Sequence, residues 1–94
     1  MPCRVVLDDS VLEKLRAMPL SRNGRVRLLT NLHYDLGHHA QDYSSARLEN
    51  DPSVFRYSHT LLDADRYFTA TFDVTDIFEP NTLTVFDVSW RWGS

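Results

Sequence analysis

Lysine is almost absent from this 94-residue sequence. Lys14 is the one lysine, and the other nine basic residues are arginines, set against 13 acidic residues. A protein that follows nucleic acid along an extended path normally carries a strong basic excess. The formal net charge of −3 therefore argues against a large phosphate-binding surface and permits only a small, focused one.

Cysteine and long apolar runs are equally scarce. The single cysteine, Cys3, cannot form a disulfide within the chain, and we assign it no role. No apolar run reaches the roughly 18 residues that a membrane-spanning helix needs. The start, MPCRVVLDDS, lacks the hydrophobic region of a signal peptide. These absences predict a cytoplasmic protein with no membrane partner.

The composition that remains predicts one folded domain over residues 1–94. Hydrophobic residues make up 43% of the chain and aromatic residues 12%, which is enough apolar material for one core. There is no repeat, low-complexity tract or linker. The charge is uneven: residues 1–47 carry seven basic and five acidic side chains, and residues 48–94 carry three basic and eight acidic ones.

The first elements are predicted to be a strand and a helix. The run CRVVL (3–7) is typical of a short strand. Ser10 and Glu13 have the spacing of a capping box, which marks the start of a helix. Apolar residues then recur at helical spacing until Pro19, which predicts a helix over about 10–18.

A second helix is predicted over about 23–36. Its leucines, with Val26 and His33, recur at helical spacing and are expected to form one buried face. Gly37 stands where a left-handed C-cap is expected. The polar residues 38–52 are expected to form the longest loop. Because the link between the two helices is short, we expect an antiparallel pair.

Three strands are predicted in the second half, over 54–62, 66–74 and 82–92. Each alternates apolar and polar residues, as a strand with one buried face does. The links DAD and TDIFEPN are turn-like and suit antiparallel neighbours. The order is therefore β-α-α-β-β-β. We predict an α+β two-layer domain in which two helices cover one face of a twisted, mainly antiparallel sheet and leave the other face partly open.

This order of elements, at this length, resembles the RelE/ParE superfamily of toxins from bacterial type II toxin–antitoxin modules. The residues that carry the resemblance are the leucines of the second helix, the Leu48 to Pro52 segment, DRYFTATFDV and the final LTVFDVSWRW. The resemblance implies a toxin that binds a cognate antitoxin protein. It leaves two activities open, a metal-independent endonuclease for mRNA on the ribosome and a gyrase-directed type that binds a protein without cutting.

By the same resemblance, Arg66 is the strand arginine and Arg91 belongs to a C-terminal functional cluster. Cleaving RNA without a metal requires a base near the 2′-hydroxyl, an acid for the leaving 5′-oxygen and a cation for the charge on phosphorus oxygens. A guanidinium suits the last role. Arg66 and Arg91 are expected to converge on the open sheet face, with Arg56 as a further binding residue. The alternative is that these arginines form cross-strand salt bridges with Asp63, Asp73 or Asp87.

For the acid and base, the candidates are His59 on the strand over 54–62 and Glu49 in the preceding loop. The superfamily often has a tyrosine or histidine near its C-terminus, where this chain has SWRWGS. An indole cannot transfer protons usefully, but Trp90 and Trp92 could stack a base or bind the antitoxin. Their alternative role, by alternation, is in the core.

Two further groups have weaker functional interpretations. Arg22, Arg25 and Arg27 surround the start of the second helix, either as a solvated face or as a docking surface for an acidic segment or a phosphate. The motif HYDLGHH holds three histidines but lacks a recognisable fourth ligand, so we expect no metal and no cofactor. A non-catalytic interaction domain of the same fold is the alternative to a toxin.

Overall fold

The computed structural model describes residues 4–43, 53–76 and 81–93, with side chains of the first range as far as His38. Its elements, in chain order, are β1 (Arg4–Leu7), α1 (Asp9–Ala17), α2 (Arg22–Tyr43), β2 (Val54–Asp63), β3 (Arg66–Thr75) and β4 (Thr82–Trp92). The predicted α+β class and the β-α-α-β-β-β order are confirmed. Among the described residues, no helix is both long and apolar enough to cross a membrane.

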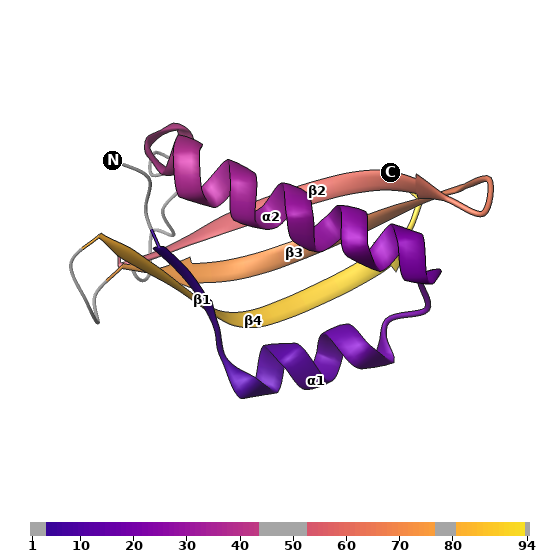
Figure 1. Cartoon of the computed structure of the whole chain (residues 1–94), viewed down its shortest axis with the longest axis horizontal. Coiled ribbons are helices and arrows are strands. Elements are labelled where there is room, and N and C mark those ends of the chain that lie inside the picture. The colour runs from indigo at the N-terminus through magenta and orange to yellow at the C-terminus, as the bar shows by residue number, and fades with distance from the viewer. Residues whose placement is uncertain (1–3, 44–52, 77–80, 94) are drawn as a thin grey trace.

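The four strands form one mixed sheet in the order β1-β4-β3-β2. β1 is parallel to β4, whereas β4, β3 and β2 are mutually antiparallel. Figure 1 shows α2 lying across β2 and β3, with α1 running beside β4. The long strands β2 and β3 are joined at a tight hairpin whose residues Ala64 and Asp65 have φ angles of 51° and 62°. Two successive positive φ angles are those of a type I′ hairpin turn. The turn predicted at DAD is therefore present.

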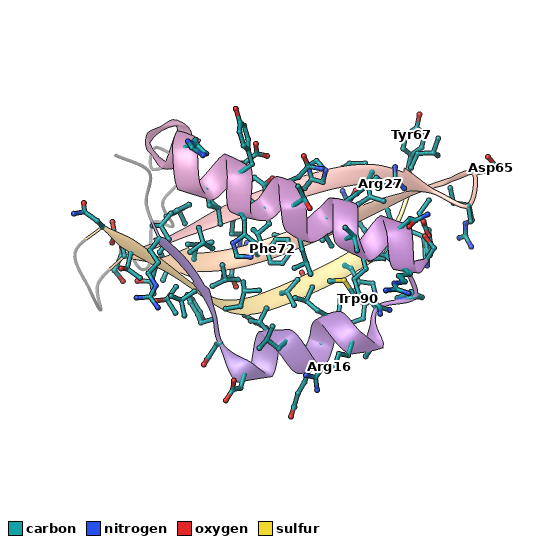
Figure 2. All side chains as sticks on the ribbon, viewed as in Figure 1. Arg16, Arg27, Asp65, Tyr67, Phe72 and Trp90 are labelled. Carbon is teal, nitrogen blue, oxygen red and sulfur yellow. The ribbon has the colours of Figure 1, made fainter. Side chains whose placement is uncertain are left out.

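One hydrophobic core joins both helices to one face of the sheet. α2 contributes Leu28, Leu32 and Leu36, which are fully buried at a four-residue spacing. β3 contributes Phe68, Ala70, Phe72 and Val74, all fully buried at the two-residue spacing of a strand. Figure 2 shows Phe72 beneath α2. Because burying one such large side chain contributes about 1.5–3 kcal/mol, this layer of contacts fixes which face of the sheet the helices cover.

The alternation of the strands leaves a second, polar face. We call it the open face. From the Arg56–Asp73 pair to the β2–β3 hairpin its residues are Arg56, Ser58, Thr60, Leu62, Tyr67, Thr69, Thr71, Asp73, Ser89 and Arg91. A register shift between Asp73 and Val74 marks a β-bulge, because Asp73 pairs with Asp87 and Val74 pairs with Val85. Phe86 is the extra residue of the bulge.

The start of α1 differs from the prediction. Asp8 is the N-cap, and its carboxylate accepts a hydrogen bond from the backbone N–H of Asp9 at 3.2 Å. The capping box assigned to Ser10 and Glu13 is therefore wrong. An aspartate directly after a strand competes with serine for the cap, because both accept hydrogen bonds from the first turn.

The end and the buried face of α2 also differ from the prediction. The helix continues to Tyr43, so Gly37 lies inside it and residues 38–43 are not a loop. Val26 and His33 are exposed, Val26 at 56%, and the buried face follows Leu28 instead. Leucines four residues apart keep a stripe of the helix against the sheet, and this tertiary packing outweighs the local signal of one glycine. The remainder of the predicted loop and Cys3 lie outside the described residues.

Candidate functional site

A hollow of about 420 Å³ lies on the open face. It is lined by Arg56, Thr69, Thr71, Asp73, Ser89, Trp90 and Arg91. This volume lies within the range of sites that bind small ligands. The hollow contains both charged groups and hydroxyls, so it suits a polar ligand.

The strand registers explain why these side chains gather. Across β3 and β4, Thr71 pairs with Ser89 and Thr69 pairs with Arg91. Across β2 and β3, Arg56 pairs with Asp73. Because directly opposite residues project from the same face, three neighbouring strands deliver their polar residues to one place.

Two pairs of hydroxyl groups lie across β2 and β3, and one member of each pair, Thr71 or Thr69, lines the hollow. Ser58 Oγ and Thr71 Oγ1 are 3.0 Å apart, and Thr60 Oγ1 and Thr69 Oγ1 are 2.8 Å apart. Thr69 also donates to the carbonyl of Gly93 at 3.1 Å, which fixes the direction of its proton. The hydroxyls are therefore positioned by the sheet and not by a ligand.

Arg56 and Asp73 form an ion pair at one end of the hollow. The Nε of Arg56 donates to Asp73 Oδ1 at 3.1 Å, and the Arg56 side chain is 59% exposed. This is the cross-strand salt bridge that we considered as the alternative role of the arginines. Exposed ion pairs contribute little to stability, so the pair is available to rearrange around a ligand.

Arg91 stands at the other end of the hollow, opposite Thr69. It is exposed, and no hydrogen bond or ion pair links its guanidinium to any other described residue. An unpaired guanidinium presents five N–H donors in a planar fork, which fits the oxygens of a phosphate or carboxylate. Arg91 is thus the described cation best placed to bind an anion in the hollow.

Arg66 does not reach this site. It is two residues before the buried Phe68 in β3, so both side chains project from the face that the helices cover. Its guanidinium carbon lies 4.6 Å from the centre of the Trp92 ring. Trp92 in turn meets Phe68 edge to face, with ring centres 5.1 Å apart. The expectation that Arg66 and Arg91 converge on the open face is wrong.

The predicted acid and base are not brought together with Arg91 either. His59 shares the helix-covered face with Tyr57, whose ring stacks on the imidazole with centres 6.5 Å apart. Tyr57 is buried and donates its hydroxyl proton to Asp35 of α2 at 2.5 Å. His59 therefore lies on the helix-covered face, on the other side of the sheet from Arg91. Glu49 lies outside the described residues.

Trp90 and Trp92 pack, half-buried, against the core. Figure 2 shows Trp90 between β4 and α1, on the helix side of the sheet. Trp90 also lines the hollow, next to Ser89 and Arg91 in the chain. Of the two predicted roles of these tryptophans, packing is the one that their positions support.

The predicted cluster of Arg22, Arg25 and Arg27 is not one free surface. Arg25 is half-buried and donates to the carbonyl of Met18 at 3.1 Å. Arg27 donates to the carbonyl of Leu62 at 2.8 Å and lies 3.9 Å from Asp63. Arg22 alone is exposed without a contact to another described residue.

Two aspartates are tied to α1 and to the start of α2. Buried Asp63 accepts hydrogen bonds from the hydroxyl and the backbone N–H of Ser21, and these bonds lower the pKa of its carboxyl. Asp87 pairs with Lys14 of α1 at 2.5 Å, and that bond lowers the pKa of Asp87. Lys14 draws Asp87 toward α1, so Asp73 is the carboxylate of the hollow.

Reasoning from the sequence missed Asp73, Thr71 and Ser89 as site residues. Asp73 was considered only as a salt-bridge partner, and the hydroxyls were not considered. Alternation already placed Asp73 and Thr71 on one face of their strand, so the signal was present. The pairing register with β4, which sets Ser89 beside them, was not readable from the sequence.

Among the described side chains, no three potential ligands are grouped to hold a metal ion. In HYDLGHH, His33 and His38 are exposed on α2, and the His38 ring contacts Tyr34 with centres 4.9 Å apart. The absence of zinc stays a prediction.

Comparison with known proteins gives a structural match. No protein-family model and no curated protein matches the sequence. A solved structure of a mutant of the E. coli toxin RelE, with two arginines replaced by alanine and in the free state, is similar to this chain with a TM-score of 0.65. The match covers 95% of this chain and 83% of that chain. The fold is RelE-like. At 16% identity, the likeness establishes the fold alone.

Proposed function

We propose that this protein is the toxin of a toxin–antitoxin pair and that it acts on RNA through the hollow of its open face. The observation that carries the proposal is the guanidinium of Arg91, which has no partner among the described residues and lies beside the hydroxyls of Thr69 and Ser89. In proteins that bind nucleic acids, the guanidinium of arginine and the hydroxyls of serine and threonine are among the groups that contact phosphate and sugar. The RelE-like fold over 95% of the chain supports the toxin assignment.

In this proposal Arg91 binds the phosphate of the bond to be cleaved. The 2′-oxygen attacks phosphorus, the bond from phosphorus to the 5′-oxygen breaks, and Arg91 stabilises the charge that develops on the other phosphate oxygens. Asp73 accepts the 2′-hydroxyl proton, a role that the sequence assigned to His59 or Glu49. The leaving 5′-oxygen takes a proton from water. The products are a 2′,3′-cyclic phosphate and a 5′-hydroxyl.

The focused site agrees with the charge of the chain. A net charge of −3 gives little long-range attraction for RNA, so binding would depend on contacts inside the hollow. The cognate antitoxin is the expected protein partner, and mRNA on the ribosome is the proposed substrate.

One observation favours a second candidate, a toxin or interaction domain that binds a protein target without cutting. Within the described residues, the hollow contains no imidazole or phenol, and Asp73 is already paired with Arg56. General acid–base catalysis would then rest on one carboxylate and water. A surface that only binds a protein needs no general acid and no general base.

Inducible expression in a bacterial host tests the proposal. The unaltered protein should arrest growth, and Arg91→Ala should not, at equal levels of soluble protein. Arg16→Ala is the matched control, because Arg16 is an exposed arginine that points away from the sheet on α1 (Figure 2). Arrest by all three proteins would reject the role of Arg91, and arrest by none would reject the toxin assignment for that host.

A further inference from the structure

Tyr67 and Leu62 form an exposed apolar pair on the open face. They lie opposite each other across β2 and β3. The Tyr67 side chain is 56% exposed and that of Leu62 is 47% exposed. Figure 2 shows the Tyr67 ring projecting outward at the β2–β3 hairpin. The Tyr67 side chain is not part of the hydrophobic core, so core packing does not account for an aromatic ring at this position.

The position of Tyr67 relative to the hollow is set by the strand. Tyr67 is two residues before Thr69, which lines the hollow and pairs with Arg91. Two residues of a strand span about 7 Å, and both side chains project from the same face. The ring therefore stands immediately beside the end of the hollow that contains Arg91.

The backbone under Tyr67 is well supported. Its carbonyl accepts a hydrogen bond from the N–H of Gly93 at 2.6 Å, and Thr69 donates to the Gly93 carbonyl. On the opposite face of the sheet, Arg66 stacks on Trp92. The backbone that carries the ring is thus held by hydrogen bonds to Gly93 and by the neighbouring Arg66–Trp92 contact. A ligand would therefore not have to order this part of the backbone when it binds.

We infer that Tyr67, with Leu62 beside it, is a stacking platform for one nucleobase of single-stranded RNA next to the phosphate held by Arg91. The inference rests on the proposed function and extends it to the base that adjoins the phosphate. Proteins that bind single strands combine cations along the backbone with aromatic rings on which bases stack. An unpaired base has two apolar faces, and the exposed ring offers a surface for one of them.

The size of the pair favours a base over a protein. A stable protein interface buries about 800 Å² on each partner, much more than two side chains supply. The next pair along the same face of β2 and β3 is polar, Thr60 and Thr69, and Thr69 lines the hollow. A small apolar platform joined to an anion site matches a nucleotide, which has one apolar part and one charged part.

The test is the affinity of the purified protein for a short, labelled, single-stranded RNA, measured by fluorescence anisotropy over a range of salt concentrations. Tyr67→Ala should weaken binding roughly 5- to 150-fold, which is the effect of losing one stacked base. Tyr67→Phe should bind like the unaltered protein, because a phenyl ring also stacks. The dependence on salt should not change in either variant, since neither removes a charge.

Two controls separate stacking from other effects. Tyr34→Ala removes an equally exposed tyrosine, 57% exposed, from α2, and it should not alter affinity. Arg91→Ala should weaken binding and reduce the slope of log affinity against log salt by about 0.7, as loss of one phosphate contact on a single strand does.

The outcomes distinguish this inference from the proposed function. Weaker binding by Tyr67→Ala alone among the tyrosine variants, with an unchanged salt slope, supports the platform. If Arg91→Ala weakens binding while Tyr67→Ala binds like the unaltered protein, the platform is overturned and the RNA site stands. If the unaltered protein binds no RNA, the proposed function fails, and so does the inference. If Tyr67→Ala lowers only the affinity for a protein partner, the platform is likewise overturned.

Discussion

Arg66 and Arg91 project from opposite faces of the sheet. Arg66 stacks on Trp92 on the helix-covered side, whereas Arg91 lies opposite Thr69 on the open face. Successive residues of a strand project from opposite faces of the sheet, and a change of rotamer cannot carry a side chain through the sheet to the other face. The two arginines therefore cannot meet at one phosphate, and the charged residues that share the hollow with Arg91 are Arg56 and Asp73.

The first prediction concerns Arg66. Arg66→Ala should lower the free energy of unfolding by about 0.5–1 kcal/mol, because an exposed cation–π contact with Trp92 is lost. Growth arrest should be unchanged at equal levels of soluble protein. Urea denaturation and the expression assay measure the two effects. Loss of arrest without loss of stability would return Arg66 to the functional site.

The second prediction concerns Asp63 and pH. Hydrogen bonds from Ser21 lower the pKa of Asp63 in the folded protein from its ordinary value of 3.8. Because the folded pKa is the lower one, the ionised carboxylate stabilises the fold above about pH 4, and this contribution is lost as the pH falls through the folded pKa. Asp63→Asn should therefore be less stable than the unaltered protein at pH 7, with a difference that narrows below pH 4.

Asp65→Asn is the control for this comparison. Asp65 is exposed in the same turn, at a φ of 62° that asparagine also tolerates. Urea denaturation at pH 7, 5 and 3 should show no such narrowing for this variant. A difference between Asp63→Asn and the unaltered protein that is the same at every pH would show that the charge of Asp63 does not stabilise the fold.

The third prediction separates docking from folding at the start of α2. Arg25 donates to the Met18 carbonyl and Arg27 to the Leu62 carbonyl, so reversing either charge removes an internal contact. Arg25→Glu should lower the melting temperature, whereas Arg22→Glu should not. If the antitoxin carries an acidic segment to this surface, Arg22→Glu should weaken the complex. Unchanged affinity, measured by calorimetry with the co-expressed antitoxin, would reject docking at Arg22.

Alternation and element order were sufficient to predict the fold. The strand over 66–74 was predicted from its alternation to have one buried face, and in the structure that face consists of Phe68, Ala70, Phe72 and Val74. The same parity assigns Arg66 to that buried face, so its position was available from the sequence. We placed it on the open face because of the family resemblance, which outweighed the simpler physical signal.

Other errors arose where the deciding interactions are tertiary. Gly37 has the character of a C-cap, but packing of Leu32 and Leu36 against the sheet carries α2 past it. The contacts of Arg25 and Arg27 depend on carbonyls of Met18 and Leu62, which only the folded chain brings near them. The hollow depends on the β3–β4 register, and no local pattern specifies that register.

The most direct test of the account maps RNA ends in cells that express the protein. If Arg91 stabilises the cleavage transition state, the unaltered protein and Arg16→Ala should generate new 5′-hydroxyl ends in mRNA at equal rates. Arg91→Ala should generate them roughly 10²–10³ times more slowly, as loss of one such donor does, with an unchanged free energy of unfolding. New 5′-hydroxyl ends at the same rate with Arg91→Ala, or growth arrest by the unaltered protein without any new ends, would contradict the account.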